Sequence, residues 1–450
     1  MASVIKLRKG LDVNLKGTAA KEKFQVANAG TFALVPDSFV GVKPKVVVKE
    51  GDVVKAGEAL FVDKAHPTVK FVSPVSGTVS LVERGERRKV LSVQVQADAE
   101  QQAVDFGKKQ VASMDGKAVL DFLLESGLFA FFKQRPYDVV ATPDVAPKAI
   151  FVSAFNSMPL SADFEFVLAG QEQDFQTGLD ALAKIAKTHL GVSSKQSNTA
   201  LTGAKNVTVT VFDGPAPAGN VGVQINHVDP INKGEVVWTI GAEEVIFIGR
   251  LFNTGKVNLS RLIAVAGSEI SKPAYAQVMV GQQLSTVLNG RIAASGCNVR
   301  IIDGNVMTGA KTSVNGFLGA HSTEINVIPE GDDVHEMLGW IMPRFNQFST
   351  SRSYFSWLCG KKEYTLDARV KGGERHMIMS NEYDRVFPMD IFPEQLVKAI
   401  ITGDIDRMEA LGIYEVAPED FAICEFVDSS KLELQRIVRD GLDMLRKEMA

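Results

Sequence analysis

Hydrophobic and polar residues alternate over short distances in the first quarter of the chain. The apolar runs are rich in valine and are separated by turn-forming sequences such as Glu50-Gly51-Asp52. Short β-branched runs bounded by turns are typical of strands. These runs are Val46–Val48, Val53–Val54, Val69–Val72, Thr78–Val82 and Val90–Val95. The pattern predicts a small all-β sandwich within residues 35–103, preceded by an N-terminal segment at 1–34.

The pattern changes from about residue 104, where helical periodicity and buried strands alternate. Ala118–Phe132 and Phe175–Leu190 have apolar residues at helical spacing, whereas KAIFVSAF (148–155) and NVTVTVFDGP (206–215) are strand-like. Alternating strands and helices predict an open sheet of the βαβ type in an α/β domain at 104–260. The glycine- and proline-rich run at 214–222 predicts a loop, and loops often carry function.

Short strands return between residues 261 and 335. RLIAVAG, QVMVG, VRIIDG and INVIPEG surround a helix-like stretch, QLSTVLNG at 283–290, which predicts a small α+β domain. From Phe392 onward, apolar residues recur every three or four positions. Residues 336–450 are therefore predicted to be a connecting segment followed by a C-terminal helical domain. The whole chain is expected to be a multidomain α+β protein.

Composition narrows the possible functions. The chain has 450 residues and a net charge of −4, which gives no reason to expect nucleic acid as a partner. Its three cysteines, Cys297, Cys359 and Cys424, form no CxxC pair, which excludes a local zinc knuckle or a clustered iron–sulfur motif. The N-terminus lacks the apolar core of a signal peptide, and no run approaches the roughly 18 apolar residues of a membrane-spanning helix.

Lys64 lies in a sequence typical of swinging-arm carrier domains, LFVDKAHPTVKFVSPVSGTV at 60–79. One interpretation is a lysine that carries lipoate or biotin at a hairpin tip. Two features favour an unmodified surface lysine on a retained scaffold. The loop after Lys64 is about two residues longer than carrier domains use, and His66-Pro67 stiffens it. An intact mass without an added group would exclude the carrier function.

Nucleotide-binding loops are not recognisable in the chain. There is no GxGxxG, and GRLFNTGKV at 249–257 has one residue too many between its glycines for a P-loop. Val257 also replaces the Ser or Thr that would meet magnesium. MTGAKTS at 307–313 has Lys311 where covalent flavin attachment needs a threonine. We therefore expect no nucleotide, covalent flavin or metal site in these stretches.

An unusual aromatic and basic stretch is ESGLFAFFKQRPYD at 125–138. Phe129, Phe131, Phe132 and Tyr137 surround Lys133 and Arg135. Aromatic faces stack on flat rings, and a cation or hydroxyl donates to a carbonyl, so the stretch suits a quinone head group. The alternative is a helix end with core aromatics and solvated cations, which the residues alone favour.

Five stretches together resemble a known family. They are KLRKGLDVNLKG (6–17), LFVDKAHPTVKFVSPVSGTV (60–79), ESGLFAFFKQRPY (125–137), VFDGPAPAGNVG (211–222) and RLIAVAGSEISKP (261–273). The chain resembles the A subunit of the bacterial sodium-translocating NADH:quinone reductase, a family similar to the flavin-binding subunit of respiratory complex I and to the C subunit of the Rnf complex. The resemblance implies a lipoyl/biotinyl-like barrel-sandwich hybrid domain, a Rossmann-like α/β domain, a β-grasp-like (SLBB) domain and a C-terminal helical domain.

The resemblance also implies which chemistry is missing. The similar families cradle flavin and NADH in a glycine-rich loop, whereas Gly127 is the only glycine of ESGLFAFFKQ and bulky Leu128 and Phe129 follow it. Their clustered iron–sulfur cysteines are reduced here to Cys424. The implied role is a peripheral subunit on the cytoplasmic face of the inner membrane, with no tightly bound cofactor. It would dock on membrane and flavin-carrying subunits while the complex couples NADH oxidation to sodium export.

The resemblance links the family to quinone and quinone-like inhibitors. The expected contacts to ubiquinone are Phe129, Phe131, Phe132, Arg135 and Tyr137, with Phe39 as a further candidate. Phe39 lies in PDSFVGVKP (36–44), which we expect to be an exposed loop. The resemblance identifies no catalytic or metal-binding residue in the isolated chain. A pure assembly scaffold without a ligand, and a flavin- or NADH-binding diaphorase, remain as alternatives.

Overall fold

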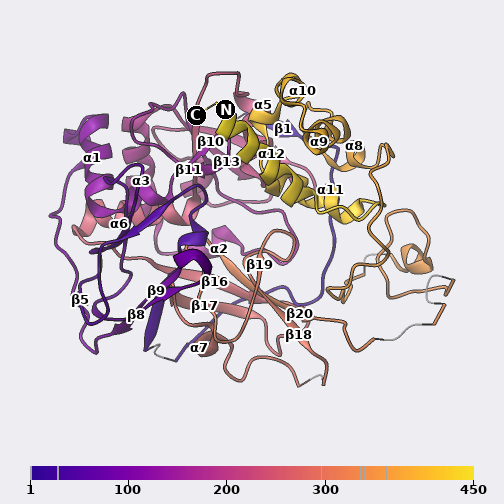
Figure 1. Cartoon of the computed structure of the whole chain (residues 1–450), viewed down its shortest axis with the longest axis horizontal. Helices are drawn as coiled ribbons and strands as arrows, with labels where there is room; N and C mark the ends of the chain where they lie inside the picture. The colour runs from indigo at the N-terminus through magenta and orange to yellow at the C-terminus, as the bar shows by residue number, and fades with distance from the viewer. Residues whose placement is uncertain are drawn as a thin grey trace.

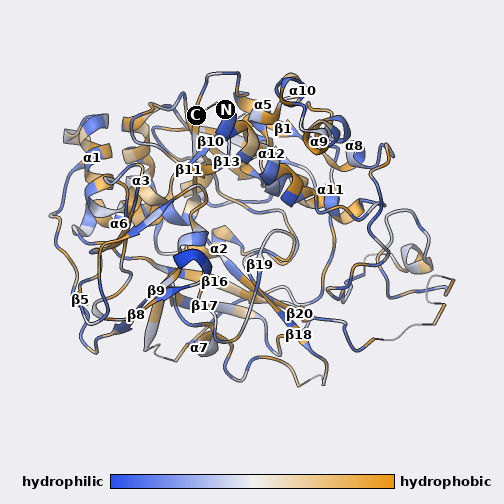
Figure 2. Cartoon of the chain, viewed as in Figure 1, coloured by the Kyte–Doolittle hydropathy of each residue, from blue (hydrophilic) through white to orange (hydrophobic). Residues whose placement is uncertain are grey.

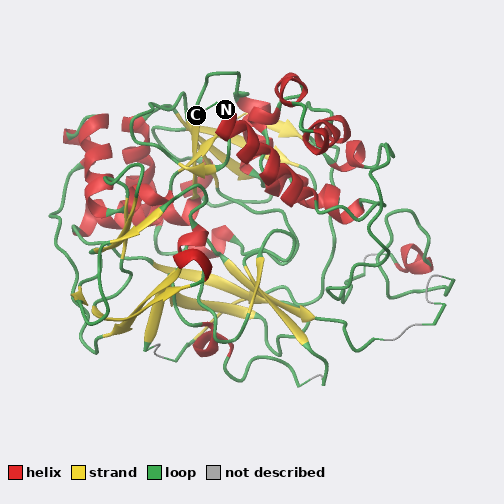
Figure 3. Ribbon diagram, in the orientation of Figure 1, coloured by secondary structure: helices red, strands yellow, loops and turns green. Residues whose placement is uncertain are grey.

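The computed structural model describes residues 3–27, 30–294, 296–334, 337–338, 341–360 and 362–449. Within these residues the strands form four sheets, of seven, six, four and three strands (Figure 1, Figure 3). None of the helices in this part of the chain combines the length and hydrophobicity that crossing a membrane requires.

Two sheets near the N-terminus form the predicted sandwich, with strand orders β3-β9-β8-β5 and β4-β6-β7. Their strands are β3 Thr31–Leu34, β4 Pro44–Val46, β5 Val53–Val54, β6 Ala59–Asp63, β7 Lys70–Val72, β8 Gly77–Arg84 and β9 Val90–Ala97. β3 lies within residues 1–34, which the sequence pattern predicts to be a segment outside the sandwich. It pairs antiparallel with β9, which buries Phe32 and Leu34 in the sandwich core.

The predicted α/β domain is built on the seven-stranded sheet, in the order β1-β14-β13-β12-β15-β10-β11. β1, β14, β13, β12 and β15 run parallel, and β10 and β11 are antiparallel at one edge. The strands are β1 Ser3–Lys6, β10 Lys133–Arg135, β11 Val139–Val140, β12 Ile150–Ser153, β13 Thr188–Ser193, β14 Thr208–Asp213 and β15 Val237–Gly241. β1 belongs to the N-terminal segment, which therefore contributes a strand to this domain.

The two predicted helices of this domain, now α1 (Gly116–Ser126) and α3 (Glu172–Ile185), end earlier than the sequence pattern predicts. Its other helices are α2 Phe164–Leu168, α4 Thr199–Thr202, α5 Val221–Val228 and α6 Ala242–Thr254. Gly127 ends α1 with a left-handed φ of 77°, and the 3₁₀ turn η4 (Leu128–Phe131) follows. α3 ends at Ile185 because the next residues pair as β13 with β12 and β14, so tertiary pairing overrides local periodicity.

Helices α3 and α6 cross very closely because glycines lie at their contact. A Cβ at Gly249 would overlap the backbone oxygen of Asp174, and one at Gly178 would overlap that of Val245. Gly249 also begins the near-P-loop stretch GRLFNTGKV, which forms the end of α6 and its cap. Gly255 caps α6 with a φ of 76°. These glycines therefore serve helix packing and capping.

Replacing Gly249 with alanine is expected to destabilise the protein by about 1–3 kcal/mol, because the added methyl group forces α3 and α6 apart. Urea denaturation followed by circular dichroism measures the effect. Gly373→Ala is the matched control, since a Cβ there meets no atom within 4 Å. Equal stability of the two variants would contradict the close packing described here.

The third domain contains a six-stranded sheet in the order β19-β18-β20-β16-β17-β2. Its elements are β2 Ala20–Phe24, β16 Ser260–Ala266, β17 Ala274–Met279, α7 Leu284–Leu288, β18 Val299–Asp303, β19 Ala310–Thr312 and β20 Glu324–Pro329. The predicted strands and the short helix are confirmed. β2 comes from the N-terminal segment and pairs parallel with β17. Segment 1–34 thus joins three sheets.

The C-terminal region is helical, as predicted. Its helices are α8 Tyr383–Val386, α9 Pro393–Thr402, α10 Ile405–Ala410, α11 Ala422–Val427 and α12 Leu434–Glu448, with the 3₁₀ turns η5 Phe355–Cys359, η6 Ile413–Glu415 and η7 Pro418–Phe421. α12 carries both apolar and polar stretches (Figure 2). It buries Leu434, Val438, Leu442 and Leu445 in a core shared with the loop after β14.

Candidate functional site

Two cavities adjoin at the carboxyl ends of the parallel strands. The smaller one, here called the switch cavity, has a volume of about 270 Å³ and is lined by residues including Phe131, Ser153, Asn220, Gly241, Glu243 and His321. The larger outer cavity has a volume of about 660 Å³, and its polar lining includes Asp12, Lys21, Asn156, Ser161, Lys195 and Lys362. Phe155, Asn156, Ala162 and Phe164 line both cavities and form their shared wall.

The topology of the sheet explains where the switch cavity lies. After β12 the chain builds β13 and β14 on one side, and then returns to add β15 on the other side of β12. Ser153 is followed by a loop, whereas Gly241 leads directly into α6, and both residues line the switch cavity. In open α/β sheets, ligands bind in the crevice at this switch point.

The predicted glycine-proline loop at 214–222 covers the same edge of the sheet. Ser153 Oγ donates to the backbone oxygen of Gly219 (2.8 Å), and the Gly219 amide donates to Ser157 Oγ (2.9 Å). Asn220 then precedes α5 and lines the switch cavity. These hydrogen bonds, from the end of β12 and the loop after it, hold the glycine-proline loop against the site.

The start of α6 carries two buried carboxylates at the switch point. Glu243 and Glu244 lie in the first turn of this helix, and their exposed fractions are 4% and 3%. In dinucleotide-binding proteins the N-terminus of such a helix meets a phosphate. Here the carboxylates occupy that end of the helix dipole. A phosphate would meet negative charge at this place.

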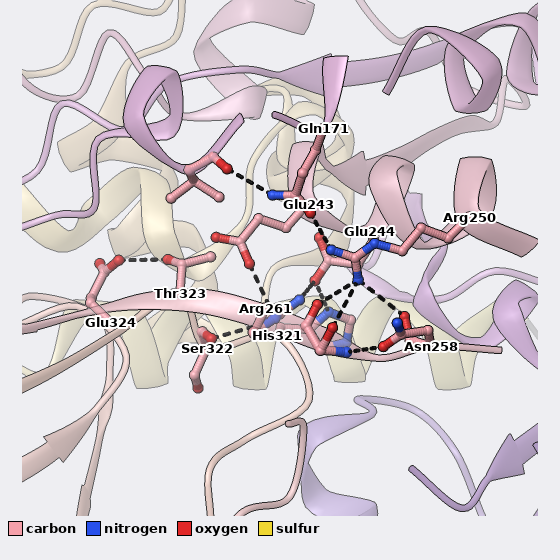
Figure 4. Close-up of polar contacts among 12 residues, drawn as sticks. Gln171, Glu243, Glu244, Arg250, Asn258, Arg261, His321, Ser322, Thr323 and Glu324 are labelled. Carbon is pink, nitrogen blue, oxygen red and sulfur yellow. Dashed lines mark hydrogen bonds and ion pairs between the residues drawn. The ribbon is translucent and has the colours of Figure 1, made fainter. Parts of the chain in front are cut away.

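One arginine of the third domain faces both carboxylates. Arg261 of β16 is fully buried, and its Nη2 donates to Glu244 Oε1 (2.7 Å). Its Nε lies 3.2 Å from Glu243 Oε2. Figure 4 shows the arginine between the two acids, with His321 beside it. This cluster ties α6 of the α/β domain to β16 of the third domain.

A single guanidinium cannot neutralise two buried carboxylates equally. Burial raises the pKa of Glu243 to about 8, and the negative charge of Glu244 adds to the rise against the pull of Arg261. Burial also opposes the ionisation of Glu244, but the charge of Arg261 and hydrogen bonding lower its pKa to about 2. At neutral pH Glu244 is therefore ionised and Glu243 is protonated.

The opposite side of the switch cavity is aromatic. The ring of Phe131 reaches the cavity from η4, and Phe155 and Phe164 come from the shared wall. His321 packs edge-on against Phe131 with ring centroids 5.6 Å apart. Burial lowers the pKa of His321, so its imidazole is neutral near pH 7. The cavity thus combines flat apolar walls with neutral and charged polar groups.

Phe39 is buried, which corrects the expectation of an exposed loop. Its exposed fraction is 3%, because the 3₁₀ turn η1 (Pro36–Ser38) folds it inward. The ring packs edge-on against Phe71 (4.5 Å between centroids), Phe131 (6.2 Å) and His321 (5.6 Å). Phe39 therefore packs against two residues that line the switch cavity, Phe131 and His321, without lining it itself.

Phe129 and Phe132 are fully buried in the domain core. Their rings stack with centroids 5.5 Å apart, and both pack edge-on against Trp238. Neither lines the switch cavity or the outer cavity. Of the four phenylalanines predicted to contact quinone, only Phe131 lines the switch cavity, Phe39 packs against it, and Phe129 and Phe132 have a packing role in the core.

Arg135 is fully buried as well, which corrects the interpretation of a solvated cation. Its guanidinium lies 3.3 Å from Asp420, 3.1 Å from Glu419 and 3.7 Å from Asp138. Tyr137 is half-buried with a φ of 82°, and its backbone oxygen accepts a hydrogen bond from Arg439. Through these ion pairs and this hydrogen bond, both residues connect the C-terminal region to the edge of the seven-stranded sheet.

Glu243, Glu244 and His321 were not among the residues expected from the sequence. One signal was available: the strand-like VVWTIG is followed at once by two acids and an apolar run, AEEVIFIG, which places both acids at the start of a buried helix. Lys64 lies exposed in the loop between β6 and β7 and lines neither cavity. Its lack of modification stays a prediction.

Comparison with known proteins identifies the domains. Residues 5–98 match the NqrA N-terminal barrel-sandwich hybrid domain, residues 114–257 the NqrA second alpha/beta domain, and residues 262–314 the NqrA C-terminal domain. A solved NAD⁺-reducing [NiFe]-hydrogenase covers 49% of this chain and 50% of its own, with 12% identity and a TM-score of 0.33. That likeness is too low to carry an argument.

Curated relatives match over nearly the full length. The A subunit of the Na⁺-translocating NADH-quinone reductase of Yersinia pestis is 34% identical over 99% of this chain and 100% of its own length. The proteins of the same name from Hahella chejuensis and Saccharophagus degradans are 35% and 36% identical, over 99% of this chain and 100% of their own. The chain therefore belongs to the NqrA family, the A subunits of the Na⁺-translocating NADH-quinone reductases.

Proposed function

We propose that this chain is a peripheral subunit, without a redox cofactor of its own, and that its switch cavity binds the ring of a quinone. The observation that carries the proposal is the pair Glu243 and Glu244 at the N-terminus of α6. These carboxylates stand where a dinucleotide phosphate would need free backbone amides. An uncharged ring meets no such repulsion.

The size and walls of the cavity support a quinone ring over a larger ligand. Its volume of about 270 Å³ lies just below the roughly 300–1,000 Å³ of sites for drug-sized molecules. Phe131, Phe155 and Phe164 offer aromatic surfaces for stacking or edge contacts. Lys133, which also lines the cavity, is a donor that suits a carbonyl oxygen.

The names of the relatives support a place in a larger complex. In it, membrane and flavin-carrying subunits would carry electrons from NADH to quinone and move sodium, while this chain binds at the cytoplasmic face and assists assembly. A specific surface favours the assembly role. Between residues 334 and 392 many large apolar side chains are exposed, including Met337, Ile341, Phe345, Phe355, Trp357 and Leu358. Such concentration is typical of a protein–protein contact.

Calorimetric titration of the purified chain with a short-chain ubiquinone tests the proposal. We expect a colourless protein that binds quinone at one site. Ala162 lies in the shared wall, and the larger side chain of Ala162→Leu should occupy part of the switch cavity. We expect this variant to bind quinone at least tenfold more weakly, a loss of about 1.4 kcal/mol in binding free energy. Ala65→Leu, on the exposed loop after Lys64, is the control and should bind like the original chain. A flavin spectrum, or binding of NADH instead of quinone, would contradict the proposal.

A further inference from the structure

Glu243 has an unusual position for a carboxyl group. It lines the switch cavity and is 4% exposed, yet its Oε2 has no hydrogen-bond partner in the described part of the chain. Arg261 Nε lies 3.2 Å away but in poor geometry for a hydrogen bond, and that Nε lacks a partner as well. A buried polar group without a partner is costly, and native proteins rarely keep one without a role.

The geometry of the cluster decides which acid keeps its proton. Arg261 makes its hydrogen bond to Glu244, and His321 lies 3.8 Å from the same carboxylate. These two groups therefore stabilise the ionised form of Glu244 more than that of Glu243. Glu243 is left in a low-dielectric place beside a negative charge, where the neutral carboxylic acid is favoured. A protonated carboxyl is a hydrogen-bond donor.

We propose that Glu243, as a carboxylic acid, is a hydrogen-bond donor of the switch cavity beside Lys133 and selects ligands that carry a carbonyl oxygen. This inference rests on the proposed quinone-binding function and names the residue that determines its specificity. A carbonyl oxygen in the cavity accepts the hydrogen bond of this carboxyl group.

Other titratable groups face Glu243 from every element around it. Glu244 and Arg250 lie on α6, Arg261 on β16 and Glu324 on β20, and all four act on its pKa. Lys133, Asp138, His321 and Glu419 line the same cavity from β10, the β10–β11 turn, the loop before β20 and η7. The burial of Glu419 raises its pKa to about 7, so a test must separate it from Glu243.

The pH dependence of quinone affinity provides that test. Since the pKa of Glu243 is raised to about 8, its protonated fraction falls about tenfold between pH 7 and pH 9. The dissociation constant of a short-chain ubiquinone should rise about tenfold over this range. In Glu243→Gln the amide donates at every pH, so its affinity should match the original chain at pH 7 and stay constant to pH 9.

One control variant separates Glu243 from another buried acid. Glu324→Gln removes another buried acid, one already hydrogen-bonded to Asn305. Its quinone affinity should still fall with rising pH, over a somewhat lower pH range, because Glu324 no longer raises the pKa of Glu243. Quinone binding with no pH dependence, or a dependence that survives in Glu243→Gln, overturns this inference and leaves the proposed function intact. Absence of quinone binding overturns both.

A ligand-free measurement supplies a second readout. Infrared difference spectra of the chain between pH 7 and pH 9 should show loss of a protonated carboxyl band. The band should be weaker in Glu243→Gln, where Glu419 still titrates, and present in Glu324→Gln. Persistence of the full band in Glu243→Gln would show that another acid titrates and would overturn the inference independently of quinone.

Discussion

Replacing Arg135 with alanine is expected to destabilise the protein by about 3–5 kcal/mol, because it leaves a buried carboxylate without its cation. The side chains of Arg135 and Asp420 are both fully buried, and 285 positions of sequence separate them. Loss of the guanidinium also frees Glu419 at the edge of the switch cavity. Urea denaturation measured by circular dichroism gives the change in free energy of unfolding.

Two further variants separate this explanation from simple loss of a long side chain. Arg436→Ala removes a cation that is 61% exposed and pairs with Glu433, so it should change the stability far less than Arg135→Ala. Adding Asp420→Asn to Arg135→Ala should recover part of the lost stability, since the unpaired buried charge disappears. If the double variant is less stable than Arg135→Ala, the ion-pair account is wrong.

Replacing Arg261 with methionine is expected to cost a similar amount, about 3–5 kcal/mol near pH 7, because Glu244 loses its buried partner. The folded pKa of Glu244, about 2, lies below its ordinary value of 4.5. Its ionised form therefore adds stability above pH 4.5, and this contribution is lost as the pH falls through about 2. The difference between the variant and the original chain should shrink over the same range.

Urea denaturation at pH 7 and at pH 3 checks both parts of this prediction. Lys311→Met serves as the control, because Lys311 is 61% exposed and its pairing with Glu330 contributes below about 1 kcal/mol. A difference for Arg261→Met that grows toward pH 3 would contradict the assignment of Glu244 as the ionised acid.

The sequence was sufficient for features that depend on local pattern. The strand at Val90–Val95 and the helices from Phe392 onward follow from alternation and from three–four spacing, and the structure confirms them. The residues at which helices end are harder to predict from local pattern. Gly127 ends α1 through a left-handed backbone, while the residues after Ile185 become a strand through pairing with β12 and β14.

The site was harder to predict because its partners are far apart in sequence or on separate domains. Arg135 looked like a solvated cation, since nothing near it in sequence reveals that Asp420 pairs with it. Glu244 and Arg261 are only 17 positions apart, but they meet across two domains. The sequence predicts an exposed Phe39 because the residues that cover it, Phe71, Phe131 and His321, come from three other segments.

A crystal structure of the purified chain with a short-chain ubiquinone would test the central claim most directly. We predict electron density for the quinone ring in the switch cavity, between Phe131 and Glu243, with a ring oxygen within hydrogen-bond distance of the Glu243 carboxyl. Density for a flavin or dinucleotide in that cavity, or a quinone bound elsewhere while the cavity stays empty, would contradict it.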